Sequence, residues 1–204
     1  MLGQSISADT PVILNIGDVM YDSALFYSKA VSPSKPVKLL LREVGNEFYL
    51  STIHRSENTD DSEQLSDIME ALNEISDSIP VVLPLHPRTK RFMKLNSIKA
   101  DNIHLIDPVG YFDILSMLKE CKAVFTDSGG IQKEAYFLKK LCVTLRKETE
   151  WVELVEHGYN FLAGSTRENI LQAEASLNGY TNEWDLSLYG DGHAGEKIVD
   201  ALMS

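Results

Sequence analysis

Short apolar runs alternate with helical patterns along almost the whole chain. Runs rich in Val, Ile, Leu and Phe predict buried strands, and they lie at residues 11–17, 48–53, 81–85, 103–106, 123–126, 141–145 and 160–163. Apolar residues at helical spacing predict helices within residues 18–29, 31–45, 60–78, 89–95, 112–120, 131–138, 152–156, 167–177 and 194–203. This alternation is typical of an α/β fold with a doubly wound, mostly parallel sheet, and about six strands fit a single Rossmann-like domain.

Polar clusters follow five of the predicted strands directly. They lie at residues 54–58, 86–88, 107–111, 128–134 and 146–151. The carboxyl ends of parallel strands share one edge of a sheet, and ligands bind along that edge. We therefore expect these five loops to form one binding site.

The stretch 124–134 predicts the centre of this site, because it is typical of a strand, a tight turn and the start of a helix. Asp127 and Ser128 are turn and N-cap residue types. Gly129 and Gly130 have no Cβ, so a ligand can approach the backbone closely. A helix start with free N–H groups is a typical phosphate site. Taken alone, the stretch would fit a capped junction without a ligand even better.

Three further side chains are candidates for ligand contacts. Glu134 lies one turn into the helix, where its carboxylate could accept hydrogen bonds from sugar hydroxyls. We interpret His54 as a donor or cation at a phosphate rather than as a strand-end cap, because it lies at the ligand edge. For His86 these two interpretations have about equal weight.

Two arginines of the polar clusters, Arg55 and Arg146, each allow two interpretations. Arg55 either contacts the ligand or pairs with Glu57. Arg146 either reaches a diphosphate or forms an ion pair with Glu148 or Glu150.

Composition narrows the class of ligand. The chain has 204 residues, of which 44% are hydrophobic and 24% charged, and a formal net charge of −11 argues against nonspecific binding to nucleic acid or anionic membranes. The two cysteines fit neither a metal site nor a disulfide framework, and the sequence contains no signal peptide and no membrane-spanning run. We therefore expect a cytoplasmic protein that requires no metal or other cofactor.

In combination, the motifs at residues 17–22, 52–58, 85–87, 127–134, 145–151 and 189–193 are specific. Together they resemble the non-hydrolysing UDP-N-acetylglucosamine 2-epimerase family, from about residue 11 to the end of the chain. The resemblance implies a GT-B architecture, in which the active site lies between two Rossmann-like domains. This chain would be the C-terminal, UDP-binding half, with residues 1–45 as connecting segment and residues 46–204 as domain. The N-terminal domain would be absent from it.

The resemblance also implies a role for each motif. Ser128, Gly129 and Gly130 would hold the diphosphate, and Glu134 would bind the ribose hydroxyls. His54 would be catalytic, beside the diphosphate and the reacting sugar. The loop from Val109 to Ile114 would lie against uracil. The remaining residues expected at the UDP-sugar are Arg55, His86, Arg146 and Trp151.

The reaction implied by the resemblance inverts C2 of the sugar through elimination of UDP to a glycal, followed by re-addition. Carboxylates of the other half would transfer the protons, so we expect this chain alone to be inactive. A GT-B glycosyltransferase half and a non-catalytic nucleotide-binding module are the alternatives. A homodimer is possible, and the missing domain would be an intramolecular partner.

The chain departs from the common N-acetylglucosamine enzymes at several positions. Trp151 and Val152 replace Arg-Pro, and Ile114 replaces an aromatic residue near uracil. The sequence of residues 149–153 is more similar to the branch that acts on UDP-2,3-diacetamido-2,3-dideoxyglucuronate. Lys133 replaces a usual acid, and we expect it at a solvated position. Apolar surface is expected to be exposed where the missing domain would lie, and the terminal helix, residues 194–203, is expected to be loose or packed against another copy.

Overall fold

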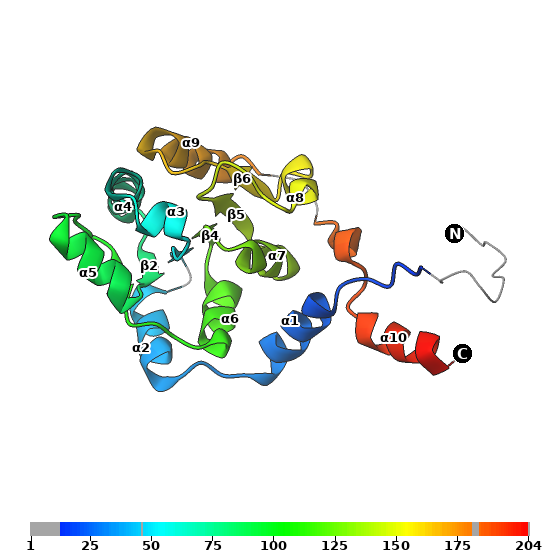
Figure 1. Ribbon diagram of the computed structural model, residues 1–204. Helices are drawn as coiled ribbons and strands as arrows, with labels where there is room; N and C mark the ends of the chain where they lie inside the picture. Colours follow the sequence, from blue (N-terminus) through cyan, green and yellow to red (C-terminus); the bar gives the residue numbers. More distant parts are fainter. Residues whose placement is uncertain (1–12, 46, 181–183, 204) are drawn as a thin grey trace.

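The computed structural model describes residues 13–45, 47–180 and 184–203 (Figure 1). Six strands in this part of the chain form one sheet in the order β3-β2-β1-β4-β5-β6, and every neighbouring pair is parallel. The strands are β1 Tyr49–Thr52, β2 Val81–Pro84, β3 His104–Ile106, β4 Ala123–Thr126, β5 Leu141–Thr144 and β6 Asn160–Leu162. The α/β class and the parallel sheet predicted from the sequence are therefore confirmed.

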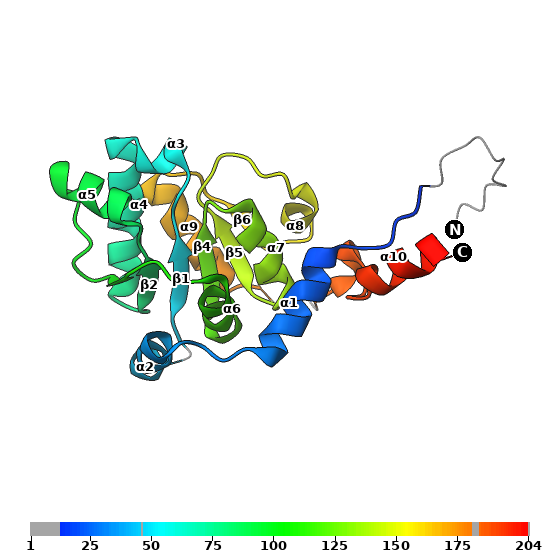
Figure 2. The ribbon, with the colours of Figure 1, turned by 60° about the horizontal axis from the view of Figure 1, so that its bottom comes forward.

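Helices connect the strands and cover the sheet. They are α1 Val19–Ala30, α2 Lys35–Val44, α3 Ser56–Thr59, α4 Ser62–Ser76, α5 Pro87–Leu95, α6 Tyr111–Glu120, α7 Gly129–Phe137, α8 Val152–Glu156, α9 Arg167–Leu177, the 3-10 helix η1 Leu186–Tyr189 and α10 Ala194–Met203. Figures 1 and 2 show α4 and α9 on one face of the sheet and α6 and α7 on the other. None of the helices in the described residues is long and apolar enough to cross a membrane.

The central strands are buried on both faces, which explains their continuous apolar runs. Tyr49 and Phe125 pack with side chains of α4, α5 and α9. Leu50 and Val124, the alternate residues of the same strands, pack with α2, α6 and α7. The hydrophobic core therefore consists of two layers, one on each side of the sheet.

The strand register brings the ends of three strands level with one another. Thr52 of β1, Thr126 of β4 and Thr144 of β5 form one row of paired residues. The residues two positions further along each chain segment are His54, Ser128 and Arg146. The predicted convergence of these loops at one edge of the sheet is therefore a consequence of the register.

The predicted strand at residues 11–17 is wrong for residues 13–17, which the structure describes. Residues 13–17 form no strand, and Ile13 is 92% exposed, while residues 11 and 12 lie outside the described part. The apolar run pairs with no strand because the chain crosses instead to the segment before α10. There the N–H of Asp18 donates to the carbonyl of Tyr189, and Gly17 lies so close that a Cβ on Gly190 would be 2.8 Å from its Cα.

The helices of the predicted connecting segment pack on the sheet domain. α2 lies against α6, and α1 lies against both α6 and α7. Tyr21 of α1 stacks on Phe137 of α7, with ring centroids 4.6 Å apart. Whether residues 1–45 connect two domains in a longer chain stays a prediction.

The terminal helix α10 lies at the corner of the molecule beside α1 (Figure 1). Its first two N–H groups, at Ala194 and Gly195, donate to the side chain of Asp22 at 3.0 and 2.7 Å. Further along the helix, Leu202 and Met203 are 81% and 83% exposed. The end of this helix therefore exposes apolar side chains, and whether another copy or a missing domain covers them stays a prediction.

Candidate functional site

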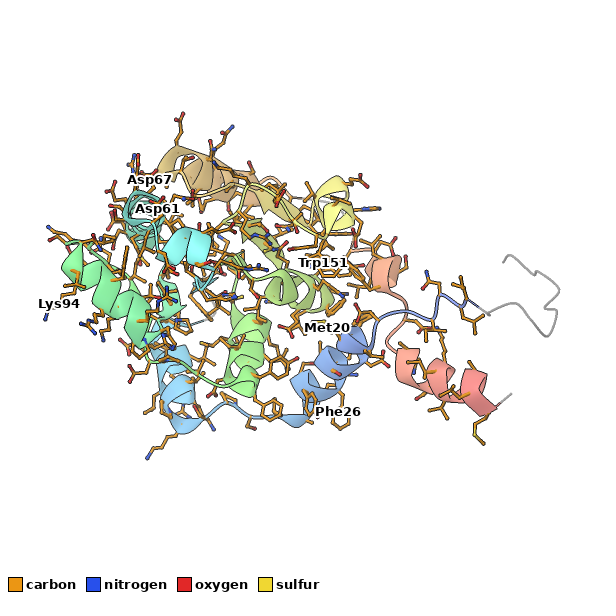
Figure 3. All side chains as sticks on the ribbon, viewed as in Figure 1. Met20, Phe26, Asp61, Asp67, Lys94 and Trp151 are labelled. Carbon is orange, nitrogen blue, oxygen red and sulfur yellow. The ribbon has the colours of Figure 1, made fainter. Side chains whose placement is uncertain are left out.

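The N-terminus of α7 lies at the centre of the row of loops that follow β1, β4 and β5. Ser128 is its N-cap, and the Ser128 hydroxyl accepts from the N–H of Ile131 at 3.5 Å. The helix begins at Gly129, two residues earlier than the sequence pattern predicted. A Cβ on Gly130 would lie 3.9 Å from Met20, which Figure 3 labels at the start of α1. A Cβ at this position would therefore make an ordinary van der Waals contact with α1.

Asp127 lies beneath the loop that follows β1 and is completely buried. Its carboxylate accepts from the backbone N–H groups of His54 and Arg55 at 3.1 and 3.0 Å and from Asn58 Nδ2 at 3.1 Å. Asn58 also donates to the carbonyl of Leu145 at 3.0 Å. Asp127 therefore organises the neighbouring loop, a role that its turn-forming residue type did not reveal.

The ring of His54 is held by the same carboxylate. His54 Nδ1 lies 3.0 Å from Asp127 Oδ1, while the His54 side chain is 57% exposed. The hydrogen bond to Asp127 and the negative charge of Asp127 raise the pKa of His54, and together they outweigh burial and the positive charge of Arg55, which lower it. The ring is therefore fixed in place, faces solvent, and is biased toward its protonated, cationic form.

The arginines form an ion-pair group with two glutamates. Arg146 contacts Glu57 through Nε and Glu150 through Nη1, each at 3.0 Å, and its side chain is only 9% exposed. Arg55 Nη2 lies 3.9 Å from Glu150. The predicted pairing of Arg146 with Glu150 is confirmed, whereas Glu148 is not its partner. The alternative pairing of Arg55 with Glu57 is wrong, because the Arg55 guanidinium lies near Glu150 and Glu57 pairs with Arg146.

Glu134 lies next to the loop expected to face uracil. It is 7% exposed, and burial raises its pKa, against a smaller lowering by a hydrogen bond with Tyr111, the first residue of α6. Val109, in the preceding loop, lines a cavity of about 380 Å³ between α2 and the segment after β3. Ile114 packs into the core of the same face. The structure therefore brings together the residues proposed for the ribose and the base.

His86 caps the next helix in the row. Its Nδ1 accepts from the backbone N–H of Arg88 at 3.2 Å at the start of α5. This contact agrees with the capping interpretation, and a role in ligand binding stays a prediction. Among the described residues, no group of three or more His, Cys, Asp or Glu side chains could hold a metal ion.

The expected solvated position of Lys133 is wrong, because its side chain is buried at 6% exposure. Lys133 forms an ion pair with Asp18, and its Nζ lies 4.3 Å from the ring centroid of Trp151 and 4.9 Å from that of Tyr189. Trp151 in turn donates its indole N–H to the carbonyl of Gly129 at 2.8 Å. Partners from three distant segments surround the lysine, so no local pattern could predict its burial.

An all-parallel α/β sheet with its polar loops along the carboxyl edge defines a Rossmann-like domain. The family model of UDP-N-acetylglucosamine 2-epimerase matches residues 5–203. The chain therefore belongs to the UDP-N-acetylglucosamine 2-epimerase family.

Individual relatives agree with this assignment. UDP-2,3-diacetamido-2,3-dideoxy-D-glucuronate 2-epimerase of Pseudomonas aeruginosa is 46% identical over 191 residues, which cover 93% of this chain and 52% of that protein. A UDP-N-acetylglucosamine 2-epimerase homolog of Methanococcus maripaludis is 43% identical over 197 residues, covering 93% of this chain and 54% of the relative. The chain thus spans about half the length of the curated relatives it matches.

Solved structures show the same relation. UDP-GlcNAc 2-epimerase of Methanocaldococcus jannaschii superposes with a TM-score of 0.83 at 34% identity, covering 92% of this chain and 55% of the other. The structure of the same enzyme in complex with UDP-GlcNAc and UDP gives a TM-score of 0.79 and covers 92% of this chain. This chain therefore has the fold of one half of such an enzyme, as the GT-B expectation requires.

Proposed function

We propose that this chain is the UDP-binding half of a UDP-sugar 2-epimerase. The observation that carries the proposal is its similarity, over 92% of its length, to a structure in complex with UDP-GlcNAc and UDP. The row of loops supports it, because an N-capped helix start with two glycines lies beside His54, whose pKa is raised by Asp127. Arg55 and Arg146 lie in the neighbouring loops, where they pair with glutamates. Such a surface is suited to a diphosphate.

Within this proposal, Ser128, Gly129 and Gly130 bind the diphosphate, with the N–H groups of the two glycines as backbone donors. The N–H of Ser128 already donates to Thr126 Oγ1 at 2.9 Å, so Ser128 contributes its hydroxyl. Glu134 accepts from the ribose hydroxyls, and the loop with Val109 borders the base. Burial raises the pKa of Glu134, whereas hydrogen bonds from ribose hydroxyls favour the ionised carboxylate, which is the stronger acceptor. Ribose binding at Glu134 therefore opposes the effect of burial on this pKa.

The proposed substrate is UDP-2,3-diacetamido-2,3-dideoxyglucuronate, on the strength of the 46% identical relative from Pseudomonas aeruginosa. In the complete protein, C2 is inverted by elimination of UDP and re-addition to the resulting glycal, with proton transfer by carboxylates outside this chain. His54 lies beside the leaving diphosphate. We propose that the reaction takes place in the cytoplasm and needs neither metal nor another cofactor.

Calorimetric titrations of UDP and ADP into the purified chain test this proposal. We expect weak binding of UDP, weaker binding of ADP because its base does not match the site, and the same UDP affinity with excess EDTA. Incubation of the UDP-sugar with the chain in deuterated water should give no inversion and no deuterium at C2. Binding of neither nucleotide by a folded chain would contradict the proposed site, and epimerisation by the chain alone would contradict the assignment of proton transfer to residues outside it.

A further inference from the structure

The carboxylate of Asp127 serves four N–H groups from a single loop. Three of them are the backbone N–H groups of His54 and Arg55 and the side-chain amide of Asn58. The fourth is His54 Nδ1, at 3.0 Å. Asp127 has no exposed surface, so this carboxylate cannot itself contact a ligand.

The His54 ring is fixed in one orientation although much of it is exposed to solvent. A histidine that is 57% exposed would ordinarily sample several side-chain rotamers, because solvent does not restrict it. Here Nδ1 is held by a buried group, and among the described residues none hydrogen-bonds Nε2. The bound nitrogen therefore faces the protein interior, and the other one is left for a ligand.

We propose that Asp127 is a positioning residue, which holds the His54 ring by Nδ1 so that Nε2 donates to a phosphate oxygen of a bound nucleoside diphosphate. The inference deepens the proposed function and rests on it for the identity of the ligand. It assigns to Asp127 a task distinct from the N-cap of α7, which Ser128 performs.

The protonation state of the ring decides whether Nε2 can donate. A neutral ring bound to Asp127 must carry its single proton on Nδ1, which leaves Nε2 as an acceptor. The cationic ring donates from both nitrogens. Asp127 raises the pKa of His54, while burial and Arg55 lower it. The other charges near the loop pair with one another, because Arg146 contacts Glu57 and Glu150, and Arg55 lies 3.9 Å from Glu150. Asp127 is thus the group that favours the donating form.

Nuclear magnetic resonance on this chain tests the contact without any ligand. Long-range ¹H–¹⁵N spectra at high pH should show neutral His54 protonated on Nδ1. In Asp127→Asn the pKa of His54 should fall by about 1 unit or more, since the neighbouring negative charge is lost. Asn58→Ala is the matched control, because it removes one donor from Asp127 but keeps the ring contact, and it should leave the pKa of His54 in place. A neutral ring protonated on Nε2, or an unchanged pKa in Asp127→Asn, would overturn the proposal.

Titration of UDP at several pH values tests the consequence for binding. Affinity should fall as pH rises through the pKa of His54, and in Asp127→Asn this fall should occur at lower pH. The variant should bind UDP roughly threefold to tenfold more weakly near pH 7, and within about twofold of the unchanged chain near pH 9, where neither ring is protonated. The ionisation of UDP itself affects both affinities equally, so it does not change the ratio of the variant's UDP affinity to that of the unchanged chain at a given pH.

His54→Gln keeps the proposal testable if Asp127→Asn does not fold. Its UDP affinity, relative to that of the unchanged chain, should decrease toward low pH, because only the unchanged chain gains a cationic donor there. A constant affinity ratio at all pH values, for either variant, would mean that the pair has only a structural role. Absence of UDP binding would refute the proposed function, while the resonance experiment would still decide the contact between Asp127 and His54.

Discussion

Replacement of Lys133 by Met should destabilise the chain more than any exposed lysine substitution. The Lys133 side chain is 6% exposed and pairs with Asp18, which is itself the N-cap of α1. Two aromatic rings, those of Trp151 and Tyr189, lie within 5 Å of its Nζ, at 4.3 and 4.9 Å. Met fills a similar volume and retains the contact with the rings, so the change removes mainly the charge.

The magnitude follows from these contacts. Loss of one partner of a buried ion pair costs about 3–5 kcal/mol. Asp18 retains some hydration, because its side chain is 18% exposed, and its Oδ1 still accepts from the N–H of Met20 at 2.8 Å. The cation–π contacts contribute about 0.5–2 kcal/mol each, and part of this is recovered by the thioether. We expect the free energy of unfolding to decrease by about 2–4 kcal/mol in total.

Urea unfolding of three variants measures this effect. Lys122→Met is the matched control, because Lys122 makes only distant contacts, at 4.0 Å to the exposed Glu47 and 5.9 Å to the ring centroid of Tyr49. This change should alter stability by about 0.5 kcal/mol or less. Asp18→Asn retains an N-cap residue type, so the double variant with Lys133→Met should lose less than the sum of the single losses. A Lys133→Met chain as stable as the Lys122→Met chain, or strictly additive losses, would refute the account of the buried pair.

Three further predictions concern single contacts. Trp151→Phe removes the indole N–H that donates to the carbonyl of Gly129, so the free energy of unfolding measured in urea should decrease by about 1 kcal/mol, and UDP should bind more weakly. Unchanged stability and unchanged UDP affinity would contradict the role of this contact. Asp22→Ala removes the acceptor at the start of α10, so amide hydrogen exchange along α10 should accelerate, by the equivalent of about 1 kcal/mol, while α9 remains as protected as before. Because burial raises the pKa of Glu134, the folded chain retains this proton above the unfolded pKa, so stability should fall as pH rises from that value through the folded one. Glu134→Gln should remove this fall, and an identical pH profile would contradict the inferred shift.

Most of the fold followed from local patterns. The strands β1 to β6 are short apolar runs with turn residues on both sides, and their burial on two faces makes such runs recognisable. Residues 13–17 show the limit of this reasoning. An apolar run becomes a strand only if a neighbouring strand pairs with it, and here the chain turns to contact the segment before α10 instead.

The candidate site was predictable where adjacency in sequence and parallel topology sufficed. The row of His54, Ser128 and Arg146 follows from strand register, which the alternation of strands and helices implies. The buried contacts of Asp127 and Lys133 did not follow, because their partners come from segments more than 15 residues away in the sequence. An Asp in a turn and a Lys on a helix most often face solvent, and only the tertiary structure shows otherwise.

Calorimetric titration of UDP into the chain, beside Glu134→Ala, tests the central claim most directly. Glu70→Ala is the matched control, because it removes an exposed carboxylate from the middle of α4. Loss of a charged hydrogen bond to ribose is worth about 1.5–3 kcal/mol, so we predict that UDP binds about tenfold or more weakly to Glu134→Ala and with unchanged affinity to Glu70→Ala. Equal UDP affinity in all three chains would contradict a ribose site at Glu134, and with it the proposed orientation of the nucleotide along the sheet edge.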